Sequence, residues 1–460
     1  MALGGGTWVT QSKILPGAYI NFVSAANASA SLSERGIATL PLPLDWGPEN
    51  EVVTVEAGDL QKNSQKLFGY AYPADELRPI REIFRHARTV HFFRLDAGGQ
   101  KAACEYARAK YPGMRGNALR MVIAENENST EESKLYDVST FLGTVQVDQQ
   151  KGIAQASDLK NNDYVDFIAD AVLAPTASVP LTGGTNGAVE EAAYQTYLDK
   201  MEAYTFNAMG CPSPDTAVSD LFVSYCKRLR DEAGKKFQVV VFRNLADYEG
   251  VVSLKNGIAE ESEIPAVAGA AVVGKTFLGR KDGQKDPALI PWVTGVVAGM
   301  AVNQSAMNLT YDGEYKVDTN YTQTELEDCV REGSFVLHQV DDQTAVLEDI
   351  NTFVSVTDEK SADFSSNQVV RVLDQVANDV ALLFRRKYIG KIANDNAGRI
   401  SLWNDIVKHH QELQNIRAIE GFTSDSVTVS PGDSKKAVVV TDHITPVSAM
   451  AQLYMSIVVA

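Results

Sequence analysis

The chain has few of the residues that build metal centres and disulfide frameworks. It carries four cysteines and six histidines among its 460 residues. The cysteines, Cys104, Cys211, Cys226 and Cys329, are far apart, and none forms a CxxC pair or has a histidine at ligand spacing. His409 and His410 are neighbours on a predicted helix, so they point about 100° apart and are poorly placed to bind one metal together. We therefore expect reduced, mostly buried thiols and no metal ion.

Positive charge is also scarce. Lys and Arg number 42 against 59 Asp and Glu, which gives a net charge of −17. A general nucleic-acid binder shows a basic patch or stripe, so this balance argues against nucleic acid as a partner. The acidic excess suits a soluble protein whose copies repel one another.

Long hydrophobic runs are missing. The most apolar stretches, 266–273 and 293–302, fall short of the roughly 20 residues that a membrane helix needs. The first residues, Met1–Gly6, have neither the basic n-region nor the apolar h-region of a secretory signal. We expect no membrane insertion and synthesis in the cytoplasm.

Motifs for catalysis are absent, apart from one glycine-rich loop at Leu181–Gly187. In a phosphate-binding P-loop a lysine and a hydroxyl residue follow the last glycine, because the lysine neutralises the phosphates and the hydroxyl holds magnesium. Here Ala188 and Val189 follow, and then Glu190 and Glu191, whose carboxylates would repel an anion. We interpret the loop as a helix-capping turn and predict no catalytic residue and no cofactor. The alternative is a soluble α/β nucleotide-binding enzyme that uses this loop.

Length and periodicity indicate a multidomain protein of α+β and α/β class. At about 150 residues per domain, the chain suits about three domains. We predict an N-terminal arm strand over 1–27, a small mixed α/β domain over 28–95, an α/β middle domain over 96–340 and a C-terminal α+β domain over 341–460. The last domain ends in a strand arm from about residue 435, and the extended N- and C-terminal arms are expected to complete it.

Several elements have clear sequence signals. Asp215 is expected to cap a helix, and the apolar run Phe237–Phe242 suits a strand buried on both faces. Asn367–Ile389 is the clearest helix, with cations in its last turn and Gly390 to end it. Further predictions are helices over Leu77–His86, Gly99–Tyr111, Gly187–Lys200, 291–307 and 400–415, and a strand at Phe353–Val356.

Both ends of the chain carry apolar strand patterns. Near the N-terminus, Ala18, Ile20 and Phe22 share one face of a predicted strand. Near the C-terminus one face carries Leu453, Met455, Ile457 and Val459, and the other carries Tyr454, Ser456 and Val458. An apolar strand with an open edge pairs readily with another chain. Each end is therefore either buried in its own sheet or built to join the sheet of a neighbour.

Several different short motifs lie along the whole chain, in a definite order. The strongest are Tyr388–Lys391 with Asn394–Arg399, and Ile444–Met450 with Leu453–Ser456. The others are Pro16–Phe22, Gly36–Pro48, Leu181–Gly187, Gly234–Gln238, Asp247–Val252, Gly295–Ser305 and Arg371–Asp374. In order and joint spacing they resemble the contractile tail sheath proteins of myophage tails and of phage-tail-like bacteriocins.

The resemblance implies a structural subunit and no enzyme. Such subunits stack as hexameric rings into a helical sleeve around a tail tube, in a stretched, metastable state. A baseplate signal releases the sleeve, which shortens and drives the tube through a bacterial envelope. The terminal arms insert as strands into neighbouring C-terminal domains, which face the tube, while the other domains face outward. The expected partners are further copies of the chain, the tube protein, and the baseplate and tail-terminator proteins. Assembly into a virion tail or tail-like particle follows synthesis in the bacterial host cytoplasm.

The resemblance and the strand patterns together give candidate site residues. For strand exchange between subunits they are Tyr19, Ile20, Phe22, Val438, Val439, Val440, Leu453, Tyr454, Met455, Ile457, Val458 and Val459. For contact with the tube they are Arg385, Arg386, Lys387, Lys391 and Arg399. The terminal strands alone would also suit another self-assembling shell or surface-layer protein, which would form flat sheets or shells.

Overall fold

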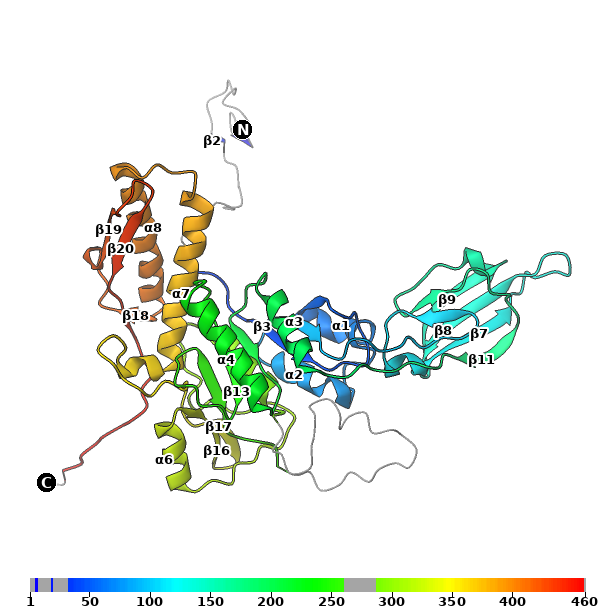
Figure 1. Cartoon of the computed structure of the whole chain (residues 1–460), viewed down its shortest axis with the longest axis horizontal. Helices are drawn as coiled ribbons and strands as arrows, with labels where there is room; N and C mark the ends of the chain where they lie inside the picture. Colours follow the sequence, from blue (N-terminus) through cyan, green and yellow to red (C-terminus); the bar gives the residue numbers. More distant parts are fainter. Residues whose placement is uncertain (1–4, 7–17, 20–31, 260–286, 459–460) are drawn as a thin grey trace. The chain divides into compact units, whose positions relative to one another are not determined.

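The computed structural model describes residues 5–6, 18–19, 32–259 and 287–458. Ile20, Phe22 and Val459 from the candidate set lie outside these ranges. The chain divides into two compact units (Figure 1). One combines Met1–Ser33 with Gln375–Val447, and the other combines Glu34–Asp374 with Ser448–Ala460. We call them the C-terminal unit and the central unit. No helix within the described ranges is long and apolar enough to cross a membrane.

A seven-stranded sheet forms the middle of the central unit. Neighbouring strands pair in parallel, except that β4 runs antiparallel to β5 at one edge. Strands from residues 37–94 thus share one sheet with strands from residues 208–335. In spatial order the strands are β15 (Ser334–Phe335), β14 (Val251–Leu254), β13 (Gln238–Phe242), β12 (Ala208–Gly210), β3 (Ile37–Leu42), β5 (Thr89–Arg94) and β4 (Val52–Glu56).

Helices cover both faces of this sheet. Side chains of β13 alternate between two cores, with Val240 and Phe242 in one and Val239 and Val241 in the other. Every residue of β13 is buried, which confirms the predicted strand. The first core is completed by α1 (Ala57–Phe68), α2 (Arg78–Ile83) and α5 (Ile290–Gly299), and the second by α3 (Glu191–Met201) and α4 (Thr216–Asp231).

The predicted helix ends in this unit are partly correct. The Asp215 side chain accepts a hydrogen bond of 2.8 Å from the Ala217 backbone N–H and so caps α4, as predicted. Helix α5 stops at Gly299, earlier than predicted. Gly295 and Gly299 of α5 lie directly against the backbone carbonyls of Ile83, the last residue of α2, and of His86 beyond it, where a Cβ would not fit. The glycine content of this helix therefore serves close packing.

An antiparallel four-stranded sheet with its own core lies within the central unit. The predicted helix Gly99–Tyr111 falls in this core and is wrong, because the segment is extended. Gln100 bridges to Thr185 and Ala103 to Thr182. The sheet strands are β11 (Thr176–Pro180), β7 (Leu119–Glu125), β8 (Tyr136–Leu142) and β9 (Val145–Ile153), and a separate pair joins β6 (Ala107–Ala109) to β10 (Val165–Phe167).

The predicted strand at Phe353–Val356 is also wrong. The Asp247 carboxylate accepts the backbone N–H groups of Val354 and Ser355, at 2.8 and 3.0 Å. These N–H groups are therefore occupied by a side chain and not by a neighbouring strand. The remaining elements of the central unit are α6 (Gln323–Arg331) and the hairpin of β16 (Leu337–Val340) with β17 (Gln343–Val346).

Two long helices and two small strand pairs make up most of the C-terminal unit. Helix α7 (Asn367–Leu383), in which the division between the units falls, continues as a π-helical turn over Phe384–Tyr388. Helix α8 (Asn396–Asn415) follows. Both predicted helices are confirmed, with α8 beginning four residues earlier than residue 400. The strand pairs are β18 (Ile419–Glu420) with β21 (Thr445–Pro446), and β19 (Val427–Pro431) with β20 (Val438–Asp442).

Candidate functional site

Specific residues determine the backbone conformation of the loop between α7 and α8. Gly390 adopts a positive φ of 70°, which ends the helical backbone after the π turn. The Asp395 side chain then caps α8 by accepting the Gly398 N–H at 2.7 Å. Gly398 itself lies against the Ala393 carbonyl, where a Cβ would overlap. The motif residues Tyr388–Lys391 and Asn394–Arg399 therefore build this turn.

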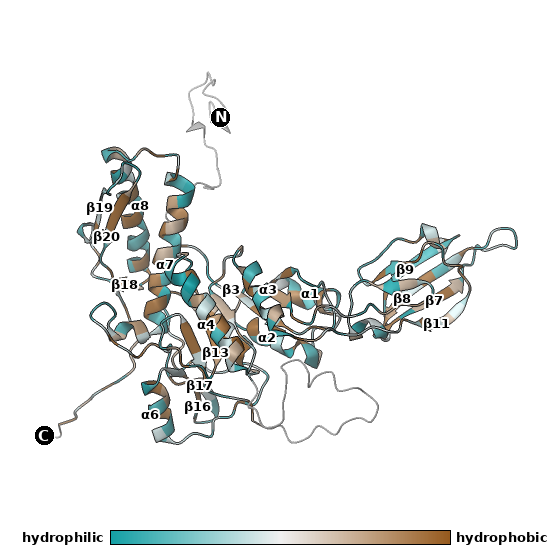
Figure 2. Ribbon diagram, in the orientation of Figure 1, coloured by the Kyte–Doolittle hydropathy of each residue, from teal (hydrophilic) through white to brown (hydrophobic). Residues whose placement is uncertain are grey.

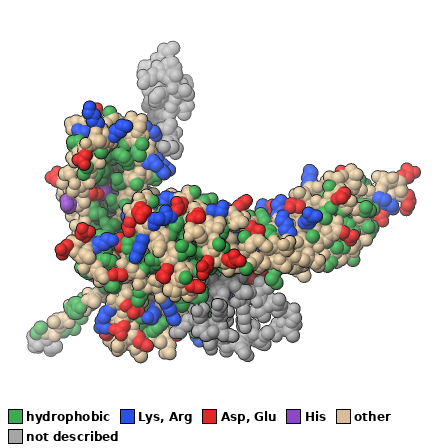
Figure 3. Space-filling model, viewed as in Figure 1, with side chains coloured by type: hydrophobic (Ala, Val, Ile, Leu, Met, Phe, Trp, Pro, Cys, Tyr) green, Lys and Arg blue, Asp and Glu red, His purple; other side chains and the backbone are tan. Residues whose placement is uncertain are grey.

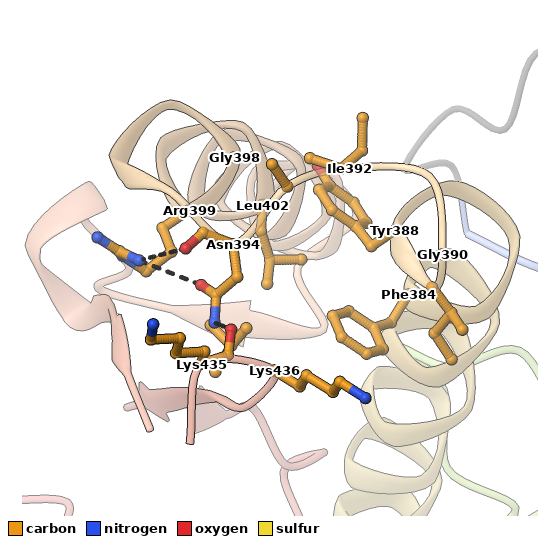
Figure 4. A pocket seen from close by; sticks show the side chains of 13 residues that line it. Phe384, Tyr388, Gly390, Ile392, Asn394, Gly398, Arg399, Leu402, Lys435 and Lys436 are labelled. Carbon is orange, nitrogen blue, oxygen red and sulfur yellow. Dashed lines mark hydrogen bonds between the residues drawn. The ribbon is translucent and has the colours of Figure 1, made fainter. Parts of the chain in front are cut away.

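A cavity opens between this loop and the β19–β20 hairpin (Figure 4). Phe384 and Tyr388 form one wall with their rings stacked, at a centroid distance of 6.0 Å. Asn394 ties the loop to the hairpin, because its Nδ2 donates to Lys435 O at 3.1 Å and to Ala437 O at 2.7 Å. Arg399 in turn donates to Asn394 (Figure 4). The rest of the lining is mostly apolar, and Lys435 and Lys436 also line the cavity.

The five candidate cations differ in how freely they can reach a partner. Lys387 donates to Asp405 at 2.6 Å, and Arg399 donates to Asn394, so both are engaged inside the unit. Lys391 donates to the Arg386 carbonyl. Arg385 and Arg386 are exposed, and neither makes an ion pair within the part of the chain that the structure describes. Lysine and arginine side chains gather at this end of the unit (Figure 3).

Strand β20 has one edge without a partner among the described residues. Gly432 N donates to Ala437 O and His443 N donates to Ser426 O, and these two bonds fix the register of the hairpin. Backbone groups alternate in direction along an antiparallel strand, so those of Val438, Val440 and Asp442 point away from β19. The strand is strongly hydrophobic (Figure 2), and Val439 and Val440 are half-exposed. This is an open edge that another strand could join.

The terminal segment Ser448–Val458 is extended and pairs as a strand with none of the other described residues. Its large apolar side chains are bare, with Tyr454 87% and Val458 89% exposed. Neither apolar face of this segment is therefore covered by its own chain. Of the two possibilities that the sequence left open, burial in its own sheet is excluded for the described residues.

The N-terminal arm is described only in part. β1 (Gly5–Gly6) pairs in parallel with β2 (Ala18–Tyr19). Tyr19 thus lies in a strand, as the predicted arm requires, while its neighbours Ile20 and Phe22 lie outside the described residues.

The glycine-rich loop Leu181–Gly187 is not a helix-capping turn, since α3 begins only at Glu191. Several of its backbone N–H groups donate hydrogen bonds to other parts of the chain. Thr185 N donates to Gln100 O, Gly187 N to Asp96 O, and Gly184 N to the Asn117 side chain at 2.8 Å. A phosphate cradle needs such N–H groups free, so the loop does not fit one.

One polar cluster has no counterpart among the predicted sites. His409 and His410 are both buried, and their Nδ1 atoms approach to 3.2 Å. Asp379 and Asp442 bind their outer nitrogens. Sequence spacing could not reveal this cluster, because the two carboxylates lie about 30 residues to either side of the pair.

Similarity to known proteins covers the whole of this architecture. Four family models match consecutive segments. They are the tail sheath protein domain III N-terminal region (residues 35–95), the phage tail sheath β-sandwich domain (97–186), the phage tail sheath central domain (187–352) and the phage tail sheath C-terminal domain (359–460). The crystal structure of a sheath tail protein from Desulfitobacterium hafniense is 35% identical, with a TM-score of 0.78, and the alignment covers 94% of this chain and 97% of that one. The chain belongs to the phage tail sheath protein family.

Two further relatives agree with this assignment. The phage-like element PBSX protein of Bacillus subtilis is 28% identical, with 99% of both chains covered. The helical sheath of the anti-feeding prophage, solved in the contracted state, shares the fold with a TM-score of 0.56 at 12% identity, over 98% of this chain and 99% of that one. The family is structural and not enzymatic, so the alternative of a nucleotide-binding enzyme is wrong. The sheath chain is a component of a phage tail or phage-like particle.

Proposed function

We propose that this chain polymerises as stacked hexameric rings around a tail tube, in a metastable extended sleeve, and that contraction of the sleeve drives the tube through a bacterial envelope. Neighbouring subunits are linked by strand exchange through their N- and C-terminal arms. One observation carries the proposal. The chain presents an uncovered apolar segment, Leu453–Val458, and also an open strand edge on β20. The two features are complementary and belong to the same molecule, so copies can link in series without closing as a dimer.

Strand addition gives such a link enough stability. Each main-chain hydrogen bond contributes about 0.5–1.5 kcal/mol net. The outward groups of Val438, Val440 and Asp442 therefore support a junction of several kcal/mol, and burial of apolar side chains adds to it. A slip of one residue would exchange the two faces of the donated strand, so the register is specific. Because each arm is part of its own subunit's polypeptide, subunits can also move relative to one another while the exchanged strand stays paired.

A proline scan of β20 tests the acceptor edge. In Val440→Pro the lost N–H points outward, so the hairpin should fold while its outer edge loses a donor in the middle of the junction. We expect fewer sleeves by negative-stain electron microscopy, since the loss of about 0.5–1.5 kcal/mol weakens each junction by about two- to tenfold and every subunit repeats the junction.

The matched control is Val439→Pro, in which the lost N–H faces Ser430 of β19. This variant should disturb the hairpin itself, with a loss of amide protection in β19. Sleeves of normal number from Val440→Pro would contradict the assignment of β20 as the acceptor. Flat sheets or closed shells, in place of cylinders of one diameter, would instead favour a surface-layer or shell protein.

Contact with the tube is proposed for the basic π-helical turn that follows α7. Of the five candidate cations, Arg385 and Arg386 are exposed and unpaired within the described chain. A double charge reversal, Arg385→Glu with Arg386→Glu, should weaken the binding of sheath to purified tubes several-fold at low salt and less at high salt. Co-sedimentation measures this.

Lys62→Glu, on an exposed position of α1, is the control for charge reversal alone. It should leave co-sedimentation unchanged. Equal loss in the control and in the double variant would assign the effect to net charge and not to this contact.

A further inference from the structure

The cluster around His409 and His410 is a line of four titratable groups that joins α7, α8 and β20. Asp379 Oδ2 lies 2.9 Å from His409 Nε2, the two Nδ1 atoms are 3.2 Å apart, and His410 Nε2 lies 2.6 Å from Asp442 Oδ2. The histidine side chains are 2% and 0% exposed. All four residues belong to the C-terminal unit.

Counting protons in this line gives a definite result. Each of its contacts places two lone-pair-bearing atoms within hydrogen-bond distance, so each needs a proton between them. The line has three such contacts. Two neutral imidazoles supply only two protons. Without a third, either the two Nδ1 lone pairs face each other or a carboxylate faces the lone pair of an imidazole, and both arrangements repel.

The surroundings decide where that proton can reside. Burial raises the pKa of Asp379, but hydrogen bonds from His409, Ser33 and Gln375 outweigh it and hold the pKa below its ordinary value. Asp379 is therefore ionised, and its carboxylate accepts a hydrogen bond from the His409 Nε2–H group. The third proton belongs to His409, His410 or Asp442. Asp442 makes no other hydrogen bond among the described residues, and its Oδ1 is buried without a partner.

The contacts of the line within the described residues include no cation. At its two ends the histidines contact Asp379 on α7 and Asp442 on β20, and the ring of Phe422 lies beside His410 at a centroid distance of 5.1 Å. Ser33 and Gln375 contribute neutral donors to Asp379. No lysine or arginine is hydrogen bonded to any of the four groups within the described ranges. The proton therefore balances one of the two carboxylate charges.

We propose that Asp379, His409, His410 and Asp442 hold one proton more than two neutral histidines carry, and that this proton fastens the β19–β20 hairpin to α8. The attachment of the hairpin is then pH-dependent. An exposed histidine in an unfolded or opened segment releases its proton near pH 6.5. Above this pH the closed state binds one more proton than the open state, so closure weakens as the pH rises, by up to tenfold in the opening equilibrium per pH unit. If β20 accepts the arm of a neighbour, as proposed above, the same proton regulates arm exchange.

Hydrogen exchange of the isolated full-length chain tests the proposal without any sleeve assembly, so a failure here is distinct from a failure of strand exchange. After correction for intrinsic exchange, protection of Val439 and Thr441, whose N–H groups face β19, should fall by up to tenfold per unit between pH 7 and 9. Asp442→Asn should remove this dependence, because the amide Nδ2 donates to His410 Nε2 and completes the line with two neutral histidines.

Asp433→Asn is the matched control, since it removes the same charge from an exposed turn of the same hairpin. It should keep the pH dependence of the wild type. A flat profile in the wild type, or an unchanged slope in Asp442→Asn, would overturn the proposal.

Imidazole ¹⁵N chemical shifts of the wild-type chain give a second measurement that needs no variant to fold. At pH 8 the extra proton should appear either as one histidine protonated on both nitrogens or as an Asp442 carboxylic acid detected by its ¹³C shift. Neutral imidazoles throughout, together with an ionised Asp442, would exclude the proposal.

Discussion

Removal of residues 456–460 is expected to leave a folded, monomeric subunit that forms no sleeves. The described part of this segment is largely uncovered, because Ile457 is 77% and Val458 89% exposed. Its loss should therefore leave the free energy of unfolding unchanged within about 0.5 kcal/mol. The same deletion removes half of a donated strand, and with it several kcal/mol from each junction. Because every subunit in a sleeve repeats the junction, assembly should fall below detection.

Circular dichroism and electron microscopy check the two halves of this result separately. A deletion of similar length in the exposed β7–β8 loop, residues 127–131, is the control for shortening the chain. It should leave both folding and sleeve formation intact. Sleeves of normal length from the 456–460 deletion would remove the basis for strand donation by this segment.

The sequence correctly predicted those elements that are determined by residues within a few positions of one another. Asp215 caps α4 through its own next turn, and Gly390 ends the helix that precedes it. β13 is a strand because each of its side chains is apolar and both faces are covered. In these cases the sequence contains the whole physical reason, so the prediction could be correct.

The errors arise where a distant segment decides the local structure. The residues Gly99–Tyr111 have helical spacing, but Thr182 and Thr185 pair with their backbone from 80 residues away and hold them extended. Val354 and Ser355 do not form the predicted strand, because their backbone N–H groups donate to the Asp247 carboxylate. Neither partner can be identified by reading along the chain.

Motifs that characterise the family turn out to be buried polar links. Arg371 donates to the Gln304 carbonyl at 2.6 Å and pairs with Asp349. In the motif Gly234–Gln238, the Gln238 side chain bonds Asn367 at 2.8 Å. Such groups tolerate few replacements, since a buried donor without an acceptor costs about 1–3 kcal/mol. These motif residues therefore stabilise the fold.

Asp374→Ala is expected to destabilise the central unit more than any surface change. Asp374 accepts two hydrogen bonds from Arg230, at 2.6 and 2.8 Å, and both side chains are less than a tenth exposed. Burial would lower the pKa of Arg230, but the Asp374 carboxylate outweighs it and raises the pKa, so the guanidinium stays charged. Removing the carboxylate leaves this charge buried and unpaired, at a cost of about 3–5 kcal/mol in the free energy of unfolding.

Two further variants separate the ion pair from simple packing. The double variant Arg230→Met with Asp374→Leu replaces both charges by apolar groups of similar size, so most of the lost stability should return. Arg331→Ala, at an exposed ion pair on α6, should cost less than about 0.5 kcal/mol. Urea denaturation of the four proteins compares these values. If the double variant were as unstable as Asp374→Ala, the cost would lie in the shape of the site and not in the unpaired charge. Through the single Arg230 guanidinium, Asp374 is linked to the end of α4 and to the Phe237 carbonyl.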